Sequence, residues 1–201
     1  MSVNAEPPIV LVHGTMGKSE NWSRVVKELS SSRSVIRPNY LERAAGNNSM
    51  NALSIRDLAD QVVSAVRAEN KQRFDLVGGS LGAAVATCIA AAFPEMVRSL
   101  VLVSGFSNGS DPWMNLQFKL WLGLASTDKV AFTKLLLVSG LSPGFLSAFD
   151  EPTINGIIEN FIASTDWRPI EQTIGIDLSL DVREYAARIK TPTLLITAKH
   201  D

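Results

Sequence analysis

The 201-residue sequence contains very few of the residues that form metal centres and disulfide frameworks. It has two histidines, His13 and His200, and a single cysteine, Cys88. One cysteine cannot form a disulfide within the chain, and Cys88 lies in an alanine-rich apolar run that is typical of a buried helix. Two histidines and one cysteine do not make a ligand cluster, so the sequence predicts neither a metal nor another cofactor.

The sequence also lacks a charge excess and a long apolar run. Lysine and arginine number 19 and aspartate and glutamate 20, so no net charge attracts nucleic acid or an anionic membrane surface. No apolar run is long enough to span a bilayer, and residues 1–8 lack the pattern of a signal peptide. These absences predict a cytoplasmic globular domain that acts on a small neutral molecule, with no nucleic-acid partner and no membrane span.

The chain is organised around residues 74–82, FDLVGGSLG, and the alanine-rich run that follows them. The apolar run before Gly78 fits a buried strand and the run after Gly82 fits a helix, which places Ser80 on the turn between them. The pattern G-x-S-x-G at this turn is typical of a nucleophile elbow. A glycine-rich turn without chemistry is the alternative, but the strand before it and the helix after it favour catalysis.

A serine hydroxyl is a poor nucleophile at neutral pH, so the site must also supply a base, an acid that orients the base, and donors for the oxyanion. The helix that begins at Leu81 offers one donor, because its first NH groups have no acceptor within the helix. Nucleotide binding is weakly supported, since G-x-G-x-x-G is not matched and no phosphate-binding lysine follows.

Strand and helix patterns alternate along the first half of the chain. The alternation predicts a mostly parallel sheet with helices on both faces, and a ligand at the carboxyl ends of the strands. The polar segment 39–52 is expected to be a surface loop. Strands are predicted over 7–12, 34–36, 74–77, 100–103 and 191–198, and helices over 19–29, 54–66 and 81–93.

His13-Gly14-Thr15-Met16-Gly17 after one buried strand, together with the Ser80 elbow after another, resembles the α/β-hydrolase superfamily over nearly the whole chain. The resemblance implies an α/β fold in which Ser80 is the nucleophile and the NH groups of Thr15 and Leu81 form the oxyanion hole. It also implies that Met16 lines the substrate pocket and that His13 shapes its loop without acting as the base. By position, the catalytic acid is Asp201.

From residue 106 to residue 189 the strand-helix alternation lapses. Three of the four tryptophans and six of the eight phenylalanines fall in this segment, which resembles the helical cap of many relatives. We therefore predict a hydrolase core formed by residues 1–105 and 190–201, with a cap inserted at 106–189. Most of the aromatic side chains are expected to pack within the cap, and only a few to reach an apolar substrate.

The catalytic histidine is expected after the acid, because the triad in this fold runs in the order Ser, acid, His. His200 directly precedes Asp201 on a predicted strand end, so the two side chains should leave on opposite sides. The sequence thus predicts that the last strand and helix of the fold are missing, and that the chain by itself is a weak catalyst for want of a base.

The leading functional hypothesis is a serine hydrolase that cleaves an ester, thioester, lactone or related acyl bond of a small apolar substrate. One alternative is a carbon-carbon bond hydrolase or a cofactor-free oxidative enzyme of the same fold. Another is a non-catalytic relative with a binding or signalling role. A base within reach of Ser80 would distinguish the enzymes from the binding protein.

Overall fold

The computed structural model describes residues 6–40 and 53–198, with five parallel strands in one sheet in the order β2-β1-β3-β4-β5. Every neighbouring pair is parallel, as the registers Val10 to Ile36, Val10 to Leu76 and Val101 to Leu194 illustrate. The predicted parallel α/β sheet is therefore confirmed. The strands are β1 Ile9–Val12, β2 Val35–Ile36, β3 Phe74–Gly79, β4 Val97–Val103 and β5 Thr193–Ile196.

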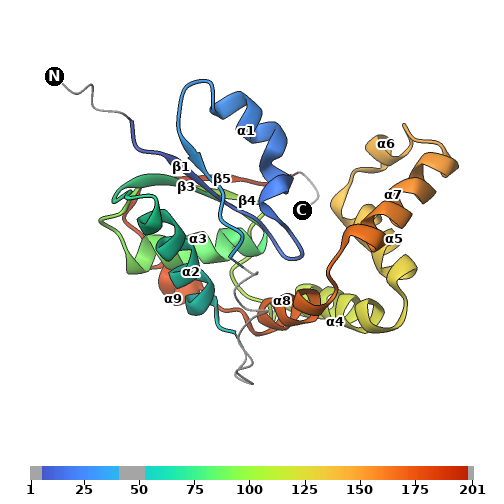
Figure 1. The fold of residues 1–201 in the computed structure, drawn as a ribbon. Helices are drawn as coiled ribbons and strands as arrows, with labels where there is room; N and C mark the ends of the chain where they lie inside the picture. The colour runs from blue at the N-terminus through green and yellow to red at the C-terminus, as the bar shows by residue number, and fades with distance from the viewer. Residues whose placement is uncertain (1–5, 41–52, 199–201) are drawn as a thin grey trace.

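Helices cover both faces of this sheet. In Figure 1, α2, α3 and α9 lie on one face and α1 lies on the other. The helices are η1 Ser19–Trp22 (a short 3-10 helix), α1 Ser23–Leu29, α2 Ile55–Ala68, α3 Leu81–Ala92, α4 Pro112–Thr127, α5 Lys129–Gly140, α6 Pro143–Leu146, α7 Glu151–Ser164, α8 Arg168–Ser179 and α9 Arg183–Ala186. Helix α2 begins with the predicted capping box, in which the NH of Asp57 donates to Ser54 Oγ at 3.2 Å and Asp57 Oδ2 accepts from the NH of Ser54 at 2.8 Å.

The main hydrophobic core lies between the sheet and the helices α2 and α3. Strand β1 is buried along its whole length, as expected for a central parallel strand covered on both faces. The predicted apolar face of α2 enters this core, and so does most of α3, including Cys88. The core residues of these two helices are Leu58, Ala59, Val62, Val63, Val66, Leu81, Ala84, Val85, Ala86, Cys88, Ile89 and Ala90.

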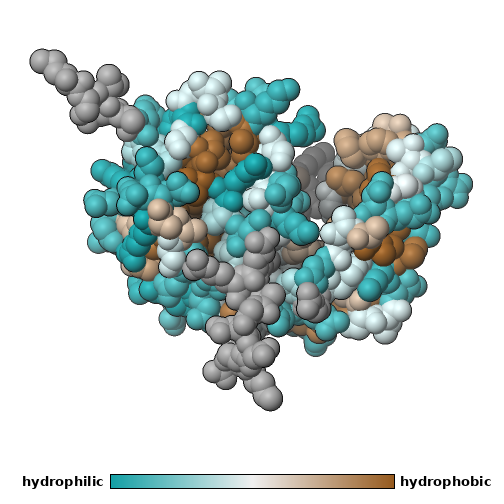
Figure 2. Space-filling view, viewed as in Figure 1, coloured by the Kyte–Doolittle hydropathy of each residue, from teal (hydrophilic) through white to brown (hydrophobic). Residues whose placement is uncertain are grey.

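Helices α4 to α8 lie between β4 and β5 in the sequence and beside the sheet in Figure 1. Side chains of α4, α5, α7 and α8 form a second hydrophobic cluster. The rings of Phe118 and Trp121 meet edge to face at 5.5 Å, and so do those of Phe132 and Trp167. Aromatic side chains thus pack much of this segment together. Apolar surface also remains over α5 and α7 in Figure 2, where Val138 is 66% exposed.

Two further features bear on the predicted boundaries. Leu180 and Val182 pack into the main core and not into the second cluster, although both fall within the predicted cap segment 106–189. Tyr40 is only 2% exposed, so the prediction of a surface loop over 39–52 is wrong at this residue. The Tyr40 ring packs against His13 in the loop that follows β1. Residues 41–52 of the predicted loop lie outside the described part of the chain.

At the opposite end of the sheet from Ser80, an ion cluster surrounds Asp75 on β3. Its carboxylate pairs with Arg98 at 2.5 Å and with Arg33 at 2.6 Å, and it accepts from Ser99 at 2.7 Å. Burial alone would raise the pKa of Asp75, but the hydrogen bonds from Arg98, Ser99 and Arg33 outweigh it and hold the pKa well below its usual range. The cluster joins strands β3 and β4 to the segment between α1 and β2.

Candidate active site at the carboxyl ends of the strands

Ser80 occupies a strained turn between β3 and α3. Its backbone has φ 54° and ψ −123°, a region that residues with a side chain rarely adopt. Its NH donates to the carbonyl of Val103 at 3.0 Å, which fixes the turn to the neighbouring strand. The hydroxyl-bearing residue is thereby held at the carboxyl end of the sheet, outside the regular part of the helix.

The two glycines of the G-x-S-x-G pattern are required by close backbone packing. A Cβ at Gly82 would lie 2.5 Å from the carbonyl oxygen of His13 and closer still to that of Val12. A Cβ at Gly78 would collide with the carbonyl of Gly82. Helix α3 can therefore approach β1 and β3 closely only because both positions lack a side chain.

The loop after β1 lies directly beside the elbow. A Cβ at Gly14 would be 3.0 Å from Ser80 Cβ and 3.5 Å from Ser80 Oγ. The loop closes on itself through a hydrogen bond from the NH of Gly17 to the carbonyl of Gly14 at 2.9 Å, and Met16 within it takes φ 58°. Thr15 and Met16, predicted from the sequence as site residues, thus sit next to the turn that carries Ser80.

His13 is held inside this loop. Its side chain is buried, its Nδ1 lies 3.0 Å from the carbonyl oxygen of Gly14, and its ring stacks on Tyr40 with 4.5 Å between centroids. Tyr40 Oη donates to the carbonyl of His13 at 2.6 Å. Burial, and to a smaller extent the nearby Asp177, raise the pKa of Tyr40 well above its usual value, so Tyr40 stays a neutral donor. Sequence reasoning missed Tyr40, because no periodicity marks it within a polar segment.

Sequence reasoning also missed Asp177, which lies in the last turn of α8 and is completely buried. Its Oδ2 accepts a hydrogen bond from Thr15 Oγ1 at 2.6 Å. Burial raises the pKa of Asp177 to about 7, although the hydrogen bond from Thr15 acts in the opposite direction. A signal was present in the sequence, since Asp177 falls at helical spacing from Ile170 and Ile174, on the face of α8 that is buried.

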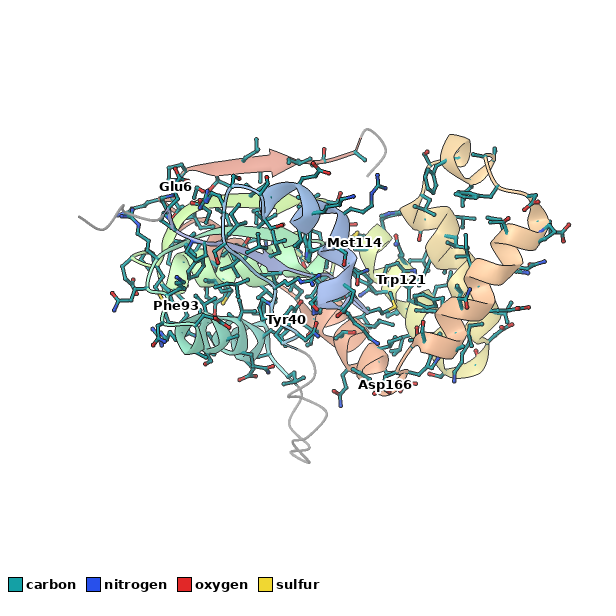
Figure 3. The ribbon with its side chains drawn as sticks, turned by 45° about the horizontal axis from the view of Figure 1, so that its top comes forward. Glu6, Tyr40, Phe93, Met114, Trp121 and Asp166 are labelled. Atoms are coloured by element: carbon teal, nitrogen blue, oxygen red, sulfur yellow. The ribbon has the colours of Figure 1, made fainter. Side chains whose placement is uncertain are left out.

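A cavity of about 260 Å³ lies between the loop after β1 and the first part of α8. Figure 3 shows Tyr40 and Asp166 on the two sides of this junction, and Met114 and Trp121 on α4. Ser80 is not among the residues that line this cavity. The lining residues are His13, Met16, Gly17, Lys18, Asn39, Thr165, Asp166, Pro169, Ile170 and Thr173.

The predicted acid, Asp201, and the neighbouring His200 lie outside the described residues, so the acid and base of the triad stay predictions. Within residues 6–40 and 53–198, no group of three or more His, Cys, Asp or Glu side chains is arranged to hold a metal ion. Among the helices that the structure describes, none combines the length and the apolar character needed to cross a membrane.

Comparison with known proteins agrees with this geometry. The profile of the family described as alpha/beta hydrolase fold matches residues 7–201. The chain belongs to the α/β-hydrolase family. A deep-sea metagenome α/β hydrolase, MGS-M2, superposes with a TM-score of 0.82 at 19% identity, over 100% of this chain and 74% of that chain.

Two curated relatives of this α/β hydrolase are named as a deacetylase and a hydrolase. Pyrrolizixenacetamide deacetylase of Xenorhabdus hominickii is 40% identical over 97% of this chain and 74% of the relative. The 2-hydroxymuconate semialdehyde hydrolase of a Pseudomonas species is 35% identical over 48% of this chain and 35% of the relative. Membership of the family, with hydrolases as relatives, supports an enzyme of the hydrolase class.

Proposed function

We propose that this α/β hydrolase is a serine hydrolase that cleaves an ester, thioester, lactone or related acyl bond of a small apolar substrate. The observation that carries the proposal is the backbone of Ser80, at φ 54° on a strand-to-helix turn, with the loop after β1 so near that a Cβ added at Gly14 would lie 3.0 Å from Ser80 Cβ. A strained serine beside a second loop at the ligand end of a parallel sheet is the arrangement that acyl transfer requires.

In the proposed reaction, Ser80 Oγ attacks the acyl carbon while a base takes its proton. The NH groups of Leu81 and Thr15 stabilise the oxyanion, each worth on the order of 3 kcal/mol. The base then gives the proton to the leaving alcohol, thiol or amine, and water attacks the acyl-enzyme to release the acid. His13 is held within its loop by Tyr40, so the proposal does not use His13 as the base, and it assigns the orienting acid to Asp201.

The deacetylase relative narrows the substrate class. That protein is named for removing an acetyl group from an acetamide, and it matches this chain along 97% of the sequence. We infer that short acyl groups on nitrogen or oxygen are the preferred substrates. In this proposal Met16 lines the acyl pocket, because it follows Thr15 in the loop and packs against the helical cap.

Carbon-carbon bond hydrolysis is the second candidate, favoured by the relative that acts on 2-hydroxymuconate semialdehyde. That similarity covers about half of this chain, whereas the similarity to the deacetylase covers nearly all of it. Turnover of acetyl amides and esters without turnover of 2-hydroxymuconate semialdehyde would favour the acyl hydrolase.

The proposal is tested by labelling with a fluorophosphonate probe and by turnover of a series of chromogenic acetyl to decanoyl esters and anilides. We expect Ser80→Ala to abolish labelling and to lower kcat by several orders of magnitude. Ser104→Ala is the matched control, because Ser104 also has a positive φ, 46°, at the end of the neighbouring strand. Labelling that persists in Ser80→Ala, or that is lost in Ser104→Ala, would contradict the assignment.

The base is tested separately with the variant His200→Gln. Loss of turnover in this variant would assign the base to His200, and unchanged turnover would exclude His200 as the base.

A further inference from the structure

Asp177 is a buried carboxyl that stability alone does not explain. It is 0% exposed, and while Oδ2 accepts from Thr15, Oδ1 is also shielded from solvent and has no hydrogen-bond partner among the described residues. Burying a carboxyl with half of its hydrogen-bonding capacity unused costs folding free energy. This cost suggests that Asp177 has a function in the candidate site.

The backbone that carries Asp177 is fixed to the base of the cap. A Cβ at Gly109 would collide with the carbonyl of Asp177, so the two backbones are in tight contact. The NH of Gly109 donates to the carbonyl of Leu180 at 2.9 Å, and the NH of Val182 donates to that of Ser107 at 2.9 Å. Asp177 therefore belongs to a rigid platform where the chain enters and leaves the cap.

The loop that Asp177 holds is strained and close to the nucleophile. Met16 has φ 58°, and a Cβ added at Gly14 would lie only 3.0 Å from Ser80 Cβ, so the loop passes close to Ser80. Thr15 lies between them, so a shift of its side chain moves the backbone NH that is proposed to bind the oxyanion. Displacing such a donor by a fraction of an ångström weakens the hydrogen bond that forms in the transition state.

We propose that Asp177 is a positioning residue, whose carboxyl holds the Thr15 hydroxyl and thereby fixes the Thr15 backbone NH relative to Ser80. The inference rests on the proposed function, because the NH of Thr15 has a catalytic role only in a serine hydrolase. It connects residues 162 positions apart in the sequence and makes the oxyanion hole depend on the seating of α8.

The test compares Asp177→Ala, which removes the acceptor, with Asp177→Asn, which keeps an oxygen for Thr15. On a chromogenic acetate ester, we expect the alanine variant to lose about 10- to 100-fold in kcat with little change in KM, and the asparagine variant to stay within about threefold of the wild type. Thr15→Val and Thr15→Ser make the same comparison at the other partner of the hydrogen bond. Valine keeps the backbone NH but lacks the hydroxyl, so Thr15→Val should lose kcat as Asp177→Ala does, whereas Thr15→Ser keeps the hydroxyl and should resemble the wild type. If Asp177→Ala does not fold, this second pair decides.

Glu171→Ala is the matched control, since Glu171 is an exposed carboxylate on the same helix that accepts a hydrogen bond from Ser126 Oγ. It should leave kcat unchanged. An unchanged kcat in Asp177→Ala, or an equal loss in the alanine and asparagine variants, would overturn the inference while leaving the serine mechanism intact.

Hydrogen exchange of the amides in residues 13–17 separates the positioning inference from the proposed function. We expect faster exchange in Asp177→Ala and wild-type exchange in Asp177→Asn. If the wild-type protein neither turns over esters nor labels at Ser80, the proposed function fails, and the exchange result still decides whether Asp177 holds the loop. Equal exchange in the wild type and Asp177→Ala would overturn the inference.

Discussion

Replacing Gly82 by alanine tests the packing that holds the elbow in place. Gly82 is the second residue of α3, and an added Cβ would lie 2.5 Å from the carbonyl oxygen of His13 and closer still to that of Val12. Both obstacles are backbone atoms of β1 and the loop after it, so no side-chain rotation can relieve the clash. We expect α3 to move away from β1 and to carry Ser80 with it.

The cost of this clash follows from the usual range for overpacking, about 1–3 kcal/mol. Gly123→Ala is the matched control, because Gly123 lies within α4 and a Cβ there would meet nothing within 4 Å. In a helix interior, alanine is favoured over glycine by about 1 kcal/mol, so this control should be neutral or slightly stabilised. The two variants should thus differ by about 1–4 kcal/mol, and at about 2–4 °C per kcal/mol for a chain of this size their Tm values should differ by roughly 2–16 °C.

The assay combines thermal unfolding with ester turnover. Because Ser80 precedes α3 directly, the shift of the helix should lower kcat by about tenfold or more in Gly82→Ala and leave Gly123→Ala unchanged. If Gly82→Ala unfolded at the temperature of the control and kept wild-type kcat, the argument from close backbone approach would be refuted.

Two further predictions concern stability. Asp75→Asn should destabilise the protein by about 1–3 kcal/mol at pH 7, because it breaks the ion pairs with the mostly buried Arg33 and the partly exposed Arg98. The folded pKa of Asp75 is depressed, so the stability that its ionised form contributes is present above about pH 4 and is lost as the pH falls. The difference in urea-unfolding free energy between the wild type and Asp75→Asn should therefore be smaller at about pH 3 than at pH 7. An equal difference at these two pH values would contradict the prediction. Phe132→Ala, at a completely buried position in α5, should cost about 3–5 kcal/mol, whereas Phe145→Ala, at a half-exposed position, should cost under about 1 kcal/mol; equal unfolding midpoints would exclude Phe132 as a core residue.

The elbow was predictable from the sequence because each of its requirements is local. A short apolar run, two glycines around a serine and an alanine-rich run specify a strand, a tight turn and a helix through backbone geometry and burial within about twenty residues. The positive φ of Ser80 and the collisions that a Cβ would meet at Gly78 and Gly82 are the physical content of that pattern. The alternation of such units was enough to predict a parallel sheet.

The tertiary structure decided what surrounds the elbow. Tyr40 is buried beside His13 through a contact between segments 27 residues apart. The hydrogen bond from Thr15 to Asp177 joins segments 162 residues apart. Neither contact leaves a trace in local periodicity beyond an acidic residue in phase with the apolar positions of α8. Which side chains fix the loop after β1 is set by how α8 docks on the strand ends, and docking is a sum of many long-range contacts that no short stretch of sequence specifies.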